Sequence, residues 1–527
     1  MSKAADLARV SVNSSFHYMW GLIVSTVISS VGAIFIARLL GSDLYGLYGI
    51  VVTIPTLIGI FRDWGVNTAM IRFAAQRRAE GKEEEIRSIF ISGLILEVAM
   101  GFALSIVSFG VSFSFADTIY NRPHIAPLIQ IASFTILAQG IGNAATAVFM
   151  GVERMEHNSI MLICQSSVKT AVVIALVIGG FSISGAVIGY TIAMTVSALV
   201  GALLVWILYK KLPKPSIRNF KVKTTIKLLL TFGTPLSLAT IISSFQAQFY
   251  AFLLPIHYLS DNVIIGNYYI ATTFVVLITF FATPITSVLF PAFSKLNPND
   301  DKETLRNVYQ FSIKYASVLV VPVAALVMSL AEPAISTLFG DTYGTAPLVL
   351  ALLSISYLYT AFGTLTNGNF IVSQGETKLS FYLTALTATI GLPMGYALIM
   401  SWGVLGLVAT TLIARLPSMF ISIAWIRKHY AMIADWRSSA QILFSSAVAA
   451  TPTYFLASLL GYSNWIRLIL GVVFFICVFG ATALLTRTIT RSDIINLRAM
   501  TGGLGRLSTL VNKLLDLTEK MMGLLRL

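Results

Sequence analysis

The feature that most constrains this chain is a succession of long apolar segments along almost all of its 527 residues. A helix needs about 20 mainly apolar residues to cross a bilayer of about 30 Å, and these segments reach that length. Strands of a membrane barrel would be shorter and would alternate in polarity. Charged residues make up only 11% of the sequence, against roughly 25% in soluble proteins. The chain is therefore predicted to be an all-α polytopic membrane protein.

Fourteen apolar segments are long enough to span. Nothing near the N-terminus is typical of a cleavable signal peptide, so the first segment is expected to act as an uncleaved anchor. The predicted spans are 14–37, 45–74, 88–115, 125–150, 159–180, 184–209, 227–254, 263–290, 308–331, 345–372, 378–400, 404–426, 438–460 and 465–486.

Basic residues gather in alternate loops between these spans. Most of the 36 Lys and Arg residues fall on one side if fourteen helices are counted. Cytoplasmic loops carry this excess in membrane proteins, so both termini are predicted to be cytoplasmic and the protein to lie in the cell (plasma or inner) membrane. The same asymmetry explains the net charge of +14, so no nucleic-acid partner is expected. The opposite loops hold mainly acids: Asp43, Asp117, Asp261, Glu332 and Asp341.

Short patterns recur along the chain at an offset of about 220 residues. They are Ser42-Asp43 with Gly46 and Ser260-Asp261 with Gly266, Asn143 with Gly151 and Asn367 with Gly375, and 184–189 with 405–409. Three matches in order favour a duplicated unit of six helices. Six is even, so both copies enter the membrane in the same direction. Parallel repeats of this kind occur in transporters whose substrate site lies between the halves near the midplane.

This repeat divides the chain into five predicted parts. Prolines interrupt any helix in the basic linker between the halves, and the apolar and charged faces of the tail are typical of a helix on the membrane surface. The parts are an N-terminal six-helix bundle (1–209), a basic cytoplasmic linker (210–226), a C-terminal six-helix bundle (227–426), two extra helices (427–487) and a cytoplasmic amphipathic tail (488–527).

Several motifs resemble those of one family. They are Ile-Ala-Arg38-Leu-Leu-Gly41-Ser-Asp-Leu-Tyr45-Gly46-Leu-Tyr48, Asp63-Trp-Gly65, Gly151-Val-Glu-Arg154, Phe232-Gly-Thr-Pro235, Gly266-Asn-Tyr-Tyr269 and Gly375-Glu-Thr-Lys378. In order and spacing they resemble the polysaccharide flippase (Wzx-like) branch of the MOP (multidrug/oligosaccharidyl-lipid/polysaccharide) exporter superfamily, over about residues 8–486. The resemblance implies a MATE-like V shape of two six-helix repeats and transport of lipid-linked oligosaccharides by alternating access.

Five ionisable residues lie deep inside predicted spans: Arg62, Asp63, Glu97, Lys169 and Arg415. An unpaired charge in hydrocarbon costs roughly 2.5–3.5 kcal/mol on insertion scales, so each must face a partner or water. One interpretation is structural, with the buried pairs Arg62–Glu97 and Asp63–Lys169 fixing helix packing. In the other, Arg62, Lys169 and Arg415 bind a phosphate-bearing substrate, while Asp63 and Glu97 are charge partners or coupling groups. Three cations against two acids favour an anionic substrate.

The expected function is therefore export of an isoprenoid-(pyro)phosphate-linked oligosaccharide or polysaccharide repeat unit by a flippase. Its partners would be the lipid-linked glycan, membrane lipids and glycan-assembly enzymes. No phosphate-binding Gly-x-x-x-x-Gly-Lys-[Ser/Thr] loop and no histidine or cysteine spacing for a metal is present in the sequence, so no cofactor, no metal and no enzyme activity are expected. Two alternatives are a MATE-type multidrug or cation antiporter and a polytopic membrane glycosyltransferase or ligase. The short outer loops leave the latter little room for an active site.

Overall fold

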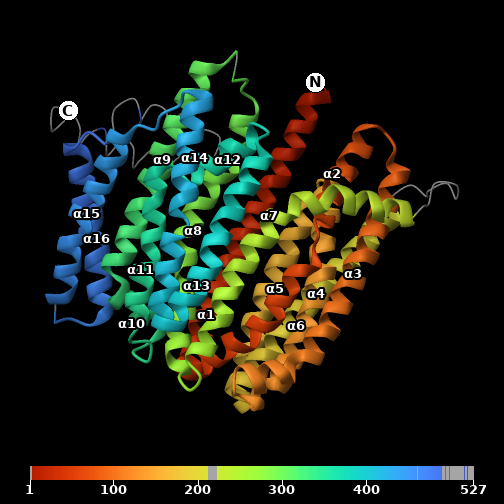
Figure 1. Cartoon of the computed structure of the whole chain (residues 1–527), viewed down its shortest axis with the longest axis horizontal. Coiled ribbons are helices and arrows are strands. Elements are labelled where there is room, and N and C mark those ends of the chain that lie inside the picture. The colour runs from red at the N-terminus through yellow and green to blue at the C-terminus, as the bar shows by residue number, and fades with distance from the viewer. Residues whose placement is uncertain are drawn as a thin grey trace. The chain divides into compact units, whose positions relative to one another are not determined.

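The computed structural model describes residues 3–211, 222–298, 300–459 and 461–488, together with Asp493, Arg498, Asp516 and Glu519. Within these residues every regular element is a helix (Figure 1). Ten helices are long and apolar enough to cross a membrane, or eleven if one bent pair forms a single span. This confirms an all-helical, multi-pass membrane protein.

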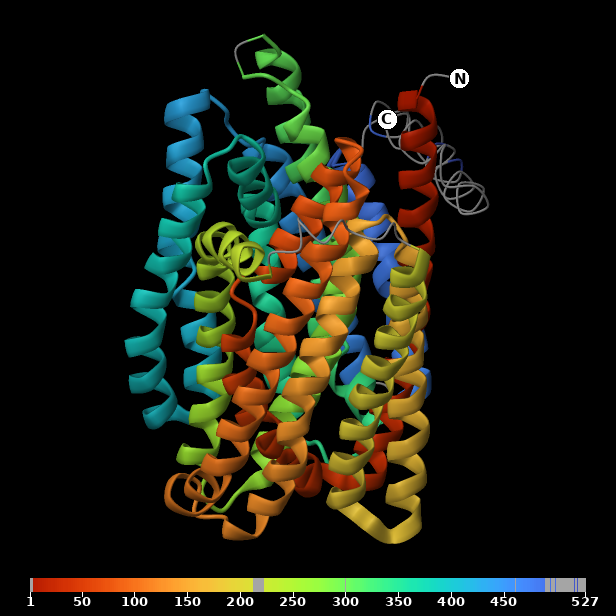
Figure 2. The same ribbon diagram turned by 90° about the vertical axis from the view of Figure 1, so that its right-hand side faces the viewer.

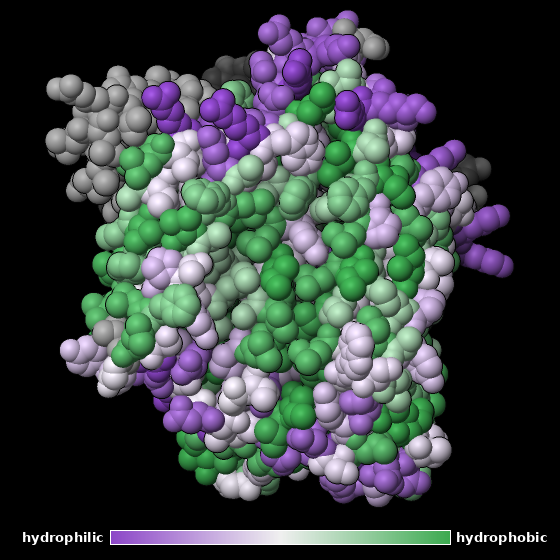
Figure 3. Space-filling model, turned by 60° about the vertical axis from the view of Figure 1, so that its left-hand side comes forward, coloured by the Kyte–Doolittle hydropathy of each residue, from purple (hydrophilic) through white to green (hydrophobic). Residues whose placement is uncertain are grey.

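The helices follow one another with short connections. Their bounds are α1 Lys3–Gly59, α2 Val66–Ala79, α3 Glu83–Ser114, α4 Ala126–Gly151, α5 Met155–Leu176, α6 Ser182–Lys211, α7 Val222–His257, α8 Asn262–Ser294, α9 Lys302–Ser329, α10 Ala331–Phe339, α11 Ala346–Leu358, α12 Thr364–Ser373, α13 Thr377–Ile413, α14 Leu416–Tyr430, α15 Trp436–Leu459 and α16 Asn464–Leu485. On the face seen in Figure 3, hydrophobic residues occupy the middle of the surface and hydrophilic residues gather above and below it. Such a band suits contact with lipid.

The chain divides into two compact units. The first comprises Met1–Thr273, Phe339–Thr345 and Thr384–Thr410, and the second comprises the rest. The first unit therefore includes α7, which the predicted boundary at residue 227 assigns to the C-terminal bundle. The five-part division predicted from the sequence stays a prediction, and its linker and tail fall largely outside the described residues.

In the first unit, α5 packs against α1 and α6, and α4 packs against α3 and α6. Two apolar cores fill the space between these helices. One surrounds Met70, Phe90 and Phe149, and the other surrounds Ile54 and Tyr120. The burial of these large side chains removes apolar area from contact with lipid and holds the helices in register.

In the second unit, α9 is central and packs against α11, α12 and α15, while α16 packs against α15. An aromatic core joins α8, α9 and α12, where the rings of Phe293 and Tyr309 lie 5.3 and 5.4 Å from that of Phe370. The carboxylate of Asp493 accepts a hydrogen bond of 2.6 Å from the Lys314 ammonium, which ties the segment after α16 to α9. Apart from Thr488, Arg498, Asp516 and Glu519, the rest of the predicted amphipathic tail lies outside the described residues.

Three long helical segments are interrupted by a glycine with non-helical backbone. The breaks lie at Gly41 in α1, at Gly180 between α5 and α6, and at Gly403 in α13, each with positive φ. Glycine tolerates this conformation because it has no Cβ. In Figure 2 the red N-terminal helix runs down the view, and the chain turns back at its lower end.

Three predicted spans, 45–74, 345–372 and 404–426, are interrupted rather than continuous. The first breaks between Ile60 and Gly65, the second at Gly363 with a bend of 52°, and the third between α13 and α14. Gly65 and Gly363 adopt φ values of 80° and 82°, which end the preceding helical turn. Broken membrane helices are tolerated where protein or water satisfies the freed backbone groups.

Candidate functional site

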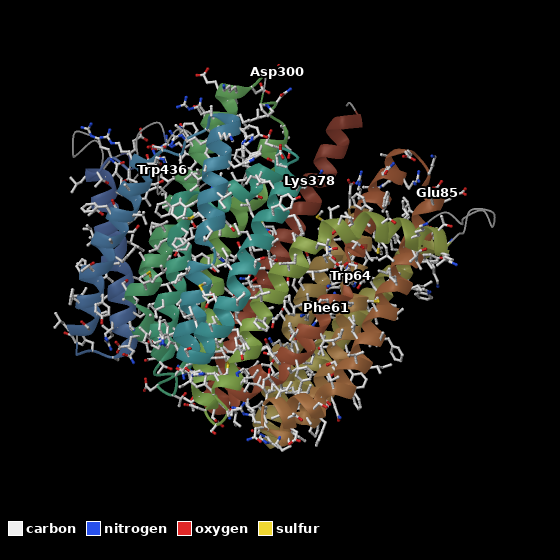
Figure 4. All side chains as sticks on the ribbon, in the orientation of Figure 1. Phe61, Trp64, Glu85, Asp300, Lys378 and Trp436 are labelled. Carbon is white, nitrogen blue, oxygen red and sulfur yellow. The ribbon has the colours of Figure 1, made fainter. Side chains whose placement is uncertain are left out.

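The break in the first of these spans places two charged residues outside regular helix. After α1 ends at Gly59, a tight turn covers Ile60–Arg62, Asp63 is extended, and α2 begins at Val66. The turn is closed by the indole Nε1 of Trp64, which donates a hydrogen bond of 2.9 Å to the carbonyl oxygen of Phe61. Figure 4 labels Phe61 and Trp64 midway along the helices of this unit, and Glu85 near the end where α2 and α3 meet. The break is therefore at membrane depth.

The guanidinium of Arg62 forms a buried ion pair with Glu97 of α3. Its Nε donates to Oε2 of Glu97 at 3.0 Å, and the two side chains are only 5% and 1% exposed. This confirms the predicted Arg62–Glu97 pair. Each charge offsets the desolvation of the other, and removing either alone would leave a charge buried without its ion-pair partner.

Asn67, the second residue of α2, joins Asp63 to this pair. Its Nδ2 donates to Oδ2 of Asp63 at 2.8 Å and to Oε1 of Glu97 at 3.2 Å. The four side chains thus form one network with two carboxylates and one guanidinium. The N-terminus of α2 lies beside Asp63, and its partial positive charge offsets part of the excess negative charge. Sequence reasoning missed Asn67 because it is neutral, although its position four residues after Asp63 was a usable signal.

Close backbone contacts hold this break in place. A Cβ on Gly65 would lie 2.1 Å from the carbonyl oxygen of Gly233 in α7, and one on Gly140 would lie 2.9 Å from that of Glu97. No larger side chain fits at either point. The Phe232-Gly-Thr-Pro235 motif therefore supplies the surface on which the broken helix packs.

Lys169 lies near the middle of the apolar stretch that begins at Met155, and it is half-buried. Its ammonium lies 5.5 Å from the centre of the Tyr190 ring on α6. Within the described part of the chain, no carboxylate comes within 4.0 Å of it. The predicted Asp63–Lys169 pair is therefore wrong, because Asp63 bonds within its own segment to Asn67 and Lys169 faces α6.

Arg415 of the second unit lies at the break between α13 and α14, rather than inside a continuous helix as predicted. Its side chain is exposed, and among described residues no carboxylate pairs with it. Its charge acts on the hydroxyls of Tyr357 and Tyr359, which belong to α11 and the turn that follows it. Arg415 therefore lies within electrostatic range of the segment that precedes the break at Gly363.

The five predicted site residues thus fall into three places. Arg62, Asp63 and Glu97 are together, whereas Lys169 and Arg415 each stand apart from them in the contacts of their own units. Over the described ranges, no three His, Cys, Asp or Glu side chains are grouped to hold a metal ion. What Lys169 and Arg415 offer chemically is electrostatic: cations at membrane depth that no described acid neutralises.

Comparison with known sequences gives consistent results. A family model described as "Polysaccharide biosynthesis protein" matches residues 35–347, more than half of the chain. The chain is 24% identical over 399 residues to the lipopolysaccharide biosynthesis protein WzxC of Escherichia coli (strain K12), covering 75% of this chain and 76% of that protein. It is 26% identical over 407 residues to a putative O-antigen transporter of Shigella flexneri, covering 75% and 92%.

Solved structures with the same fold are transporters of the membrane. The lipid II flippase MurJ in an inward closed conformation aligns with a TM-score of 0.71 at 14% identity, covering 89% of this chain and 98% of that one. An inward-facing MATE multidrug transporter of the MOP superfamily aligns with a TM-score of 0.64 at 20% identity, covering 77% and 94%. At these identities the likeness concerns the fold alone.

Proposed function

The chain belongs to the polysaccharide biosynthesis protein family, and from this premise we propose that it is a flippase for a lipid-linked glycan. The named relatives of the family are lipopolysaccharide, O-antigen and succinoglycan proteins of synthesis or transport. These names agree with the prediction of a transporter rather than an enzyme. The substrate we propose is an oligosaccharide or polysaccharide repeat unit on an isoprenoid (pyro)phosphate, moved across the cell membrane by alternating access.

The observation that carries this proposal is the pair of unneutralised cations at membrane depth. Lys169 and Arg415 have no carboxylate partner among the described residues. Charges in that position are costly unless they meet water or an anion. A phosphate group would supply the anion, and the planar donor fork of arginine suits its oxygens. On this ground we propose each of these cations, Lys169 in the first unit and Arg415 in the second, as a contact for phosphate.

The network around Arg62 has a second proposed role. Arg62 is the third predicted phosphate ligand, but in this structure its Nε is bonded to Glu97. A phosphate that reached it would compete with that carboxylate. Asp63 and Glu97 are therefore proposed as the charge partners of Arg62 when no substrate is bound. They are also proposed to couple substrate release to a change of conformation.

A fourteen-helix membrane domain is the architecture we propose. Three of the ten apolar helices are 42, 56 and 54 residues long, about twice the length a bilayer requires, and each contains one of the glycine breaks. Dividing these three at their breaks and counting the bent pair of α11 and α12 as one more span brings the number to fourteen. An even number keeps both termini on one side, and the basic loops put that side in the cytoplasm.

The proposed repeat has support inside the first unit. Gly46 and Gly266 occupy equivalent positions of the duplicated motif, and they lie against each other. A Cβ on Gly46 would lie 2.8 Å from the nitrogen of Gly266, and one on Gly266 would lie 3.1 Å from the nitrogen of Gly46. Equivalent residues meet reciprocally in this way where a two-fold axis passes between them. This contact favours two parallel repeats related by an axis along the membrane normal.

Reconstituted vesicles test the function directly. The purified protein is incorporated with a fluorescent isoprenyl pyrophosphate that carries the glycan of the host, and a membrane-impermeant reagent quenches the outer leaflet. We expect the protein to make the inner pool accessible, while protein-free vesicles keep it protected. A protein that moves organic cations but leaves the lipid-linked glycan in place would instead indicate the multidrug antiporter alternative. Co-purification with the host's glycosyltransferases would test the proposed assembly partners.

A further inference from the structure

The first unit contains a group of tyrosines that the proposed function has not used. Several tyrosines of this region bond their hydroxyls to the protein. Tyr343 donates to the carbonyl of Ala37 at 2.8 Å, and the hydroxyl of Tyr269 lies 2.6 Å from that of Thr53. A buried tyrosine ordinarily finds such a partner. These residues are therefore part of the packed framework.

Tyr48 and Tyr190 differ from this pattern. Both are half-buried, and within the described ranges neither hydroxyl has a hydrogen-bond partner. Their ring centres lie 6.3 Å apart with the planes at 90°, so one ring presents its edge to the other. The ring of Tyr45, which is only 8% exposed, lies 6.1 Å from that of Tyr48. The half-buried Tyr48 ring thus packs between the buried ring of Tyr45 and the ring of Tyr190.

Lys169 lies at the deeper end of this pair. Its ammonium is 5.5 Å from the centre of the Tyr190 ring. A cation in that place cannot face hydrocarbon without a large penalty, so the side of Tyr190 that it shares faces water or a ligand. Lys169, Tyr190 and Tyr48 thus follow one another in space, and in the described part of the chain neither the ammonium nor either phenol hydroxyl has a hydrogen-bond partner.

The depths of these groups form a series. Tyr48 lies six residues after Ser42 and Tyr190 eight residues after Ser182, about 9 and 12 Å from the helix ends predicted to face outside. Lys169 lies twelve residues before Phe181, about 18 Å from that end. A ligand whose anion reached Lys169 would therefore extend past Tyr190 and then Tyr48 on its way outward.

We infer that Tyr48 and Tyr190 form a subsite for the first sugar of the lipid-linked glycan, next to the phosphate bound at Lys169. A pyranose ring has an apolar C–H face and a rim of hydroxyls. The face packs on an aromatic ring, and the rim bonds to free phenol hydroxyls, which is the combination that these two residues offer. This inference rests on the proposed function and names the part of the substrate that contacts Tyr48 and Tyr190.

Binding experiments on the purified full chain separate the two claims. The probes are farnesyl pyrophosphate, bare and carrying one glucose, galactose or N-acetylglucosamine on its terminal phosphate. We expect the wild type to bind at least one glycosylated probe more tightly than the bare lipid. Tyr48→Leu and Tyr190→Leu should each lower the affinity for the preferred glycosylated probe by about two- to tenfold and leave the affinity for the bare lipid unchanged. Lys169→Met should weaken both probes.

The controls keep the outcomes distinct. Tyr190→Phe keeps the ring and loses the hydroxyl, so we expect an intermediate loss. Tyr396→Leu removes a ring of α13 that is 60% exposed and has no part in the proposed site, so it should change neither affinity. A wild type that binds neither probe would contradict the proposed function itself. Two outcomes would overturn only the sugar subsite. In one, the wild type binds the bare and the glycosylated lipids with equal affinity; in the other, it prefers a glycosylated lipid and the tyrosine variants keep that preference.

Discussion

The helix break at Arg62 in the first unit differs from the break at Arg415 in the second unit in what surrounds the arginine. Both interrupt predicted membrane helices, and both carry an arginine. Arg62 is 5% exposed and bonded to Glu97, whereas Arg415 is exposed and has no carboxylate partner among the described residues. The same residue type at a helix break thus serves packing in one place and is available to an anion in the other. Whether a cation in a membrane span stabilises packing or can bind an anion depends on the side chains around it.

The largest expected effect breaks the buried side of this comparison. Arg62→Leu leaves Glu97 charged without its ion-pair partner and should lower the free energy of unfolding by about 3–5 kcal/mol. Thermal unfolding in detergent and abundance in the membrane measure this loss. The paired change Arg62→Leu with Glu97→Leu removes both charges and should restore stability. If Arg62→Leu is abundant and stable, the ion pair with Glu97 does not support the fold.

A backbone change at the same break comes next. Gly65→Ala adds a Cβ that would lie 2.1 Å from the carbonyl oxygen of Gly233, at a residue with φ of +80°. Strain and overpacking together should cost about 2–4 kcal/mol of stability. Gly81→Ala is the matched control, because Gly81 has φ of +72° and no atom within 4 Å of the added group. Equal losses of stability in the two variants would show that the positive φ alone is responsible and that the close contact with α7 adds no cost.

Removing either unneutralised cation should reduce export without reducing stability. Lys169→Met and Arg415→Met remove charges that pair with no described acid, so abundance and unfolding temperature should stay near those of the wild type. Export of the glycan, measured in a host that lacks the native gene, should fall by about tenfold or more, since a hydrogen bond to a charged group is worth about 1.5–3 kcal/mol. Export at the wild-type level by both variants would remove the phosphate assignment.

The smallest effect belongs to an exposed ion pair at the end of α2. Glu80 contacts Arg77 at 2.7 Å, and hydrogen bonds from Gln76 and then from Lys82 and Arg77 lower the pKa of its carboxyl to about 2. Because the folded pKa is lowered, any stabilisation is complete above the ordinary pKa and is lost only as the pH falls towards about 2. At neutral pH, Glu80→Gln should therefore leave the unfolding temperature unchanged, since solvent screens the pair. A clear loss at pH 7 would show that surface pairs support this region as buried ones do.

Part of the candidate site could be predicted from positions along the chain. The pair Arg62–Glu97 is predicted because both residues lie deep inside predicted spans, where a charge needs a partner, and the structure joins them at 3.0 Å. The same reasoning pairs Lys169 with Asp63, which is wrong. Depth follows from counting residues, whereas the direction in which a side chain points depends on how each helix is rotated against its neighbours.

Neutral members of the site had no comparable signal. Asn67 completes the network around Arg62, and Tyr48 and Tyr190 adjoin Lys169, yet asparagine and tyrosine are ordinary residues of membrane helices. Their roles follow only from distances, such as the 3.2 Å from Asn67 to Glu97 and the 5.5 Å from Lys169 to the Tyr190 ring. Partners that lie 30 and 21 residues apart are brought together by packing, which no local pattern records.

The sequence by itself determined the class of this protein, since apolar length requires membrane helices, and the order of its motifs indicated the family before any contact was known. Only the tertiary structure decided where predicted spans break, as at Gly65, and which cations are already neutralised, as Arg62 is by Glu97. The physical reason is that hydrophobicity and helical rise add up locally along the chain. Ion pairing in a membrane depends instead on distances of a few ångströms between helices, which only their packing sets.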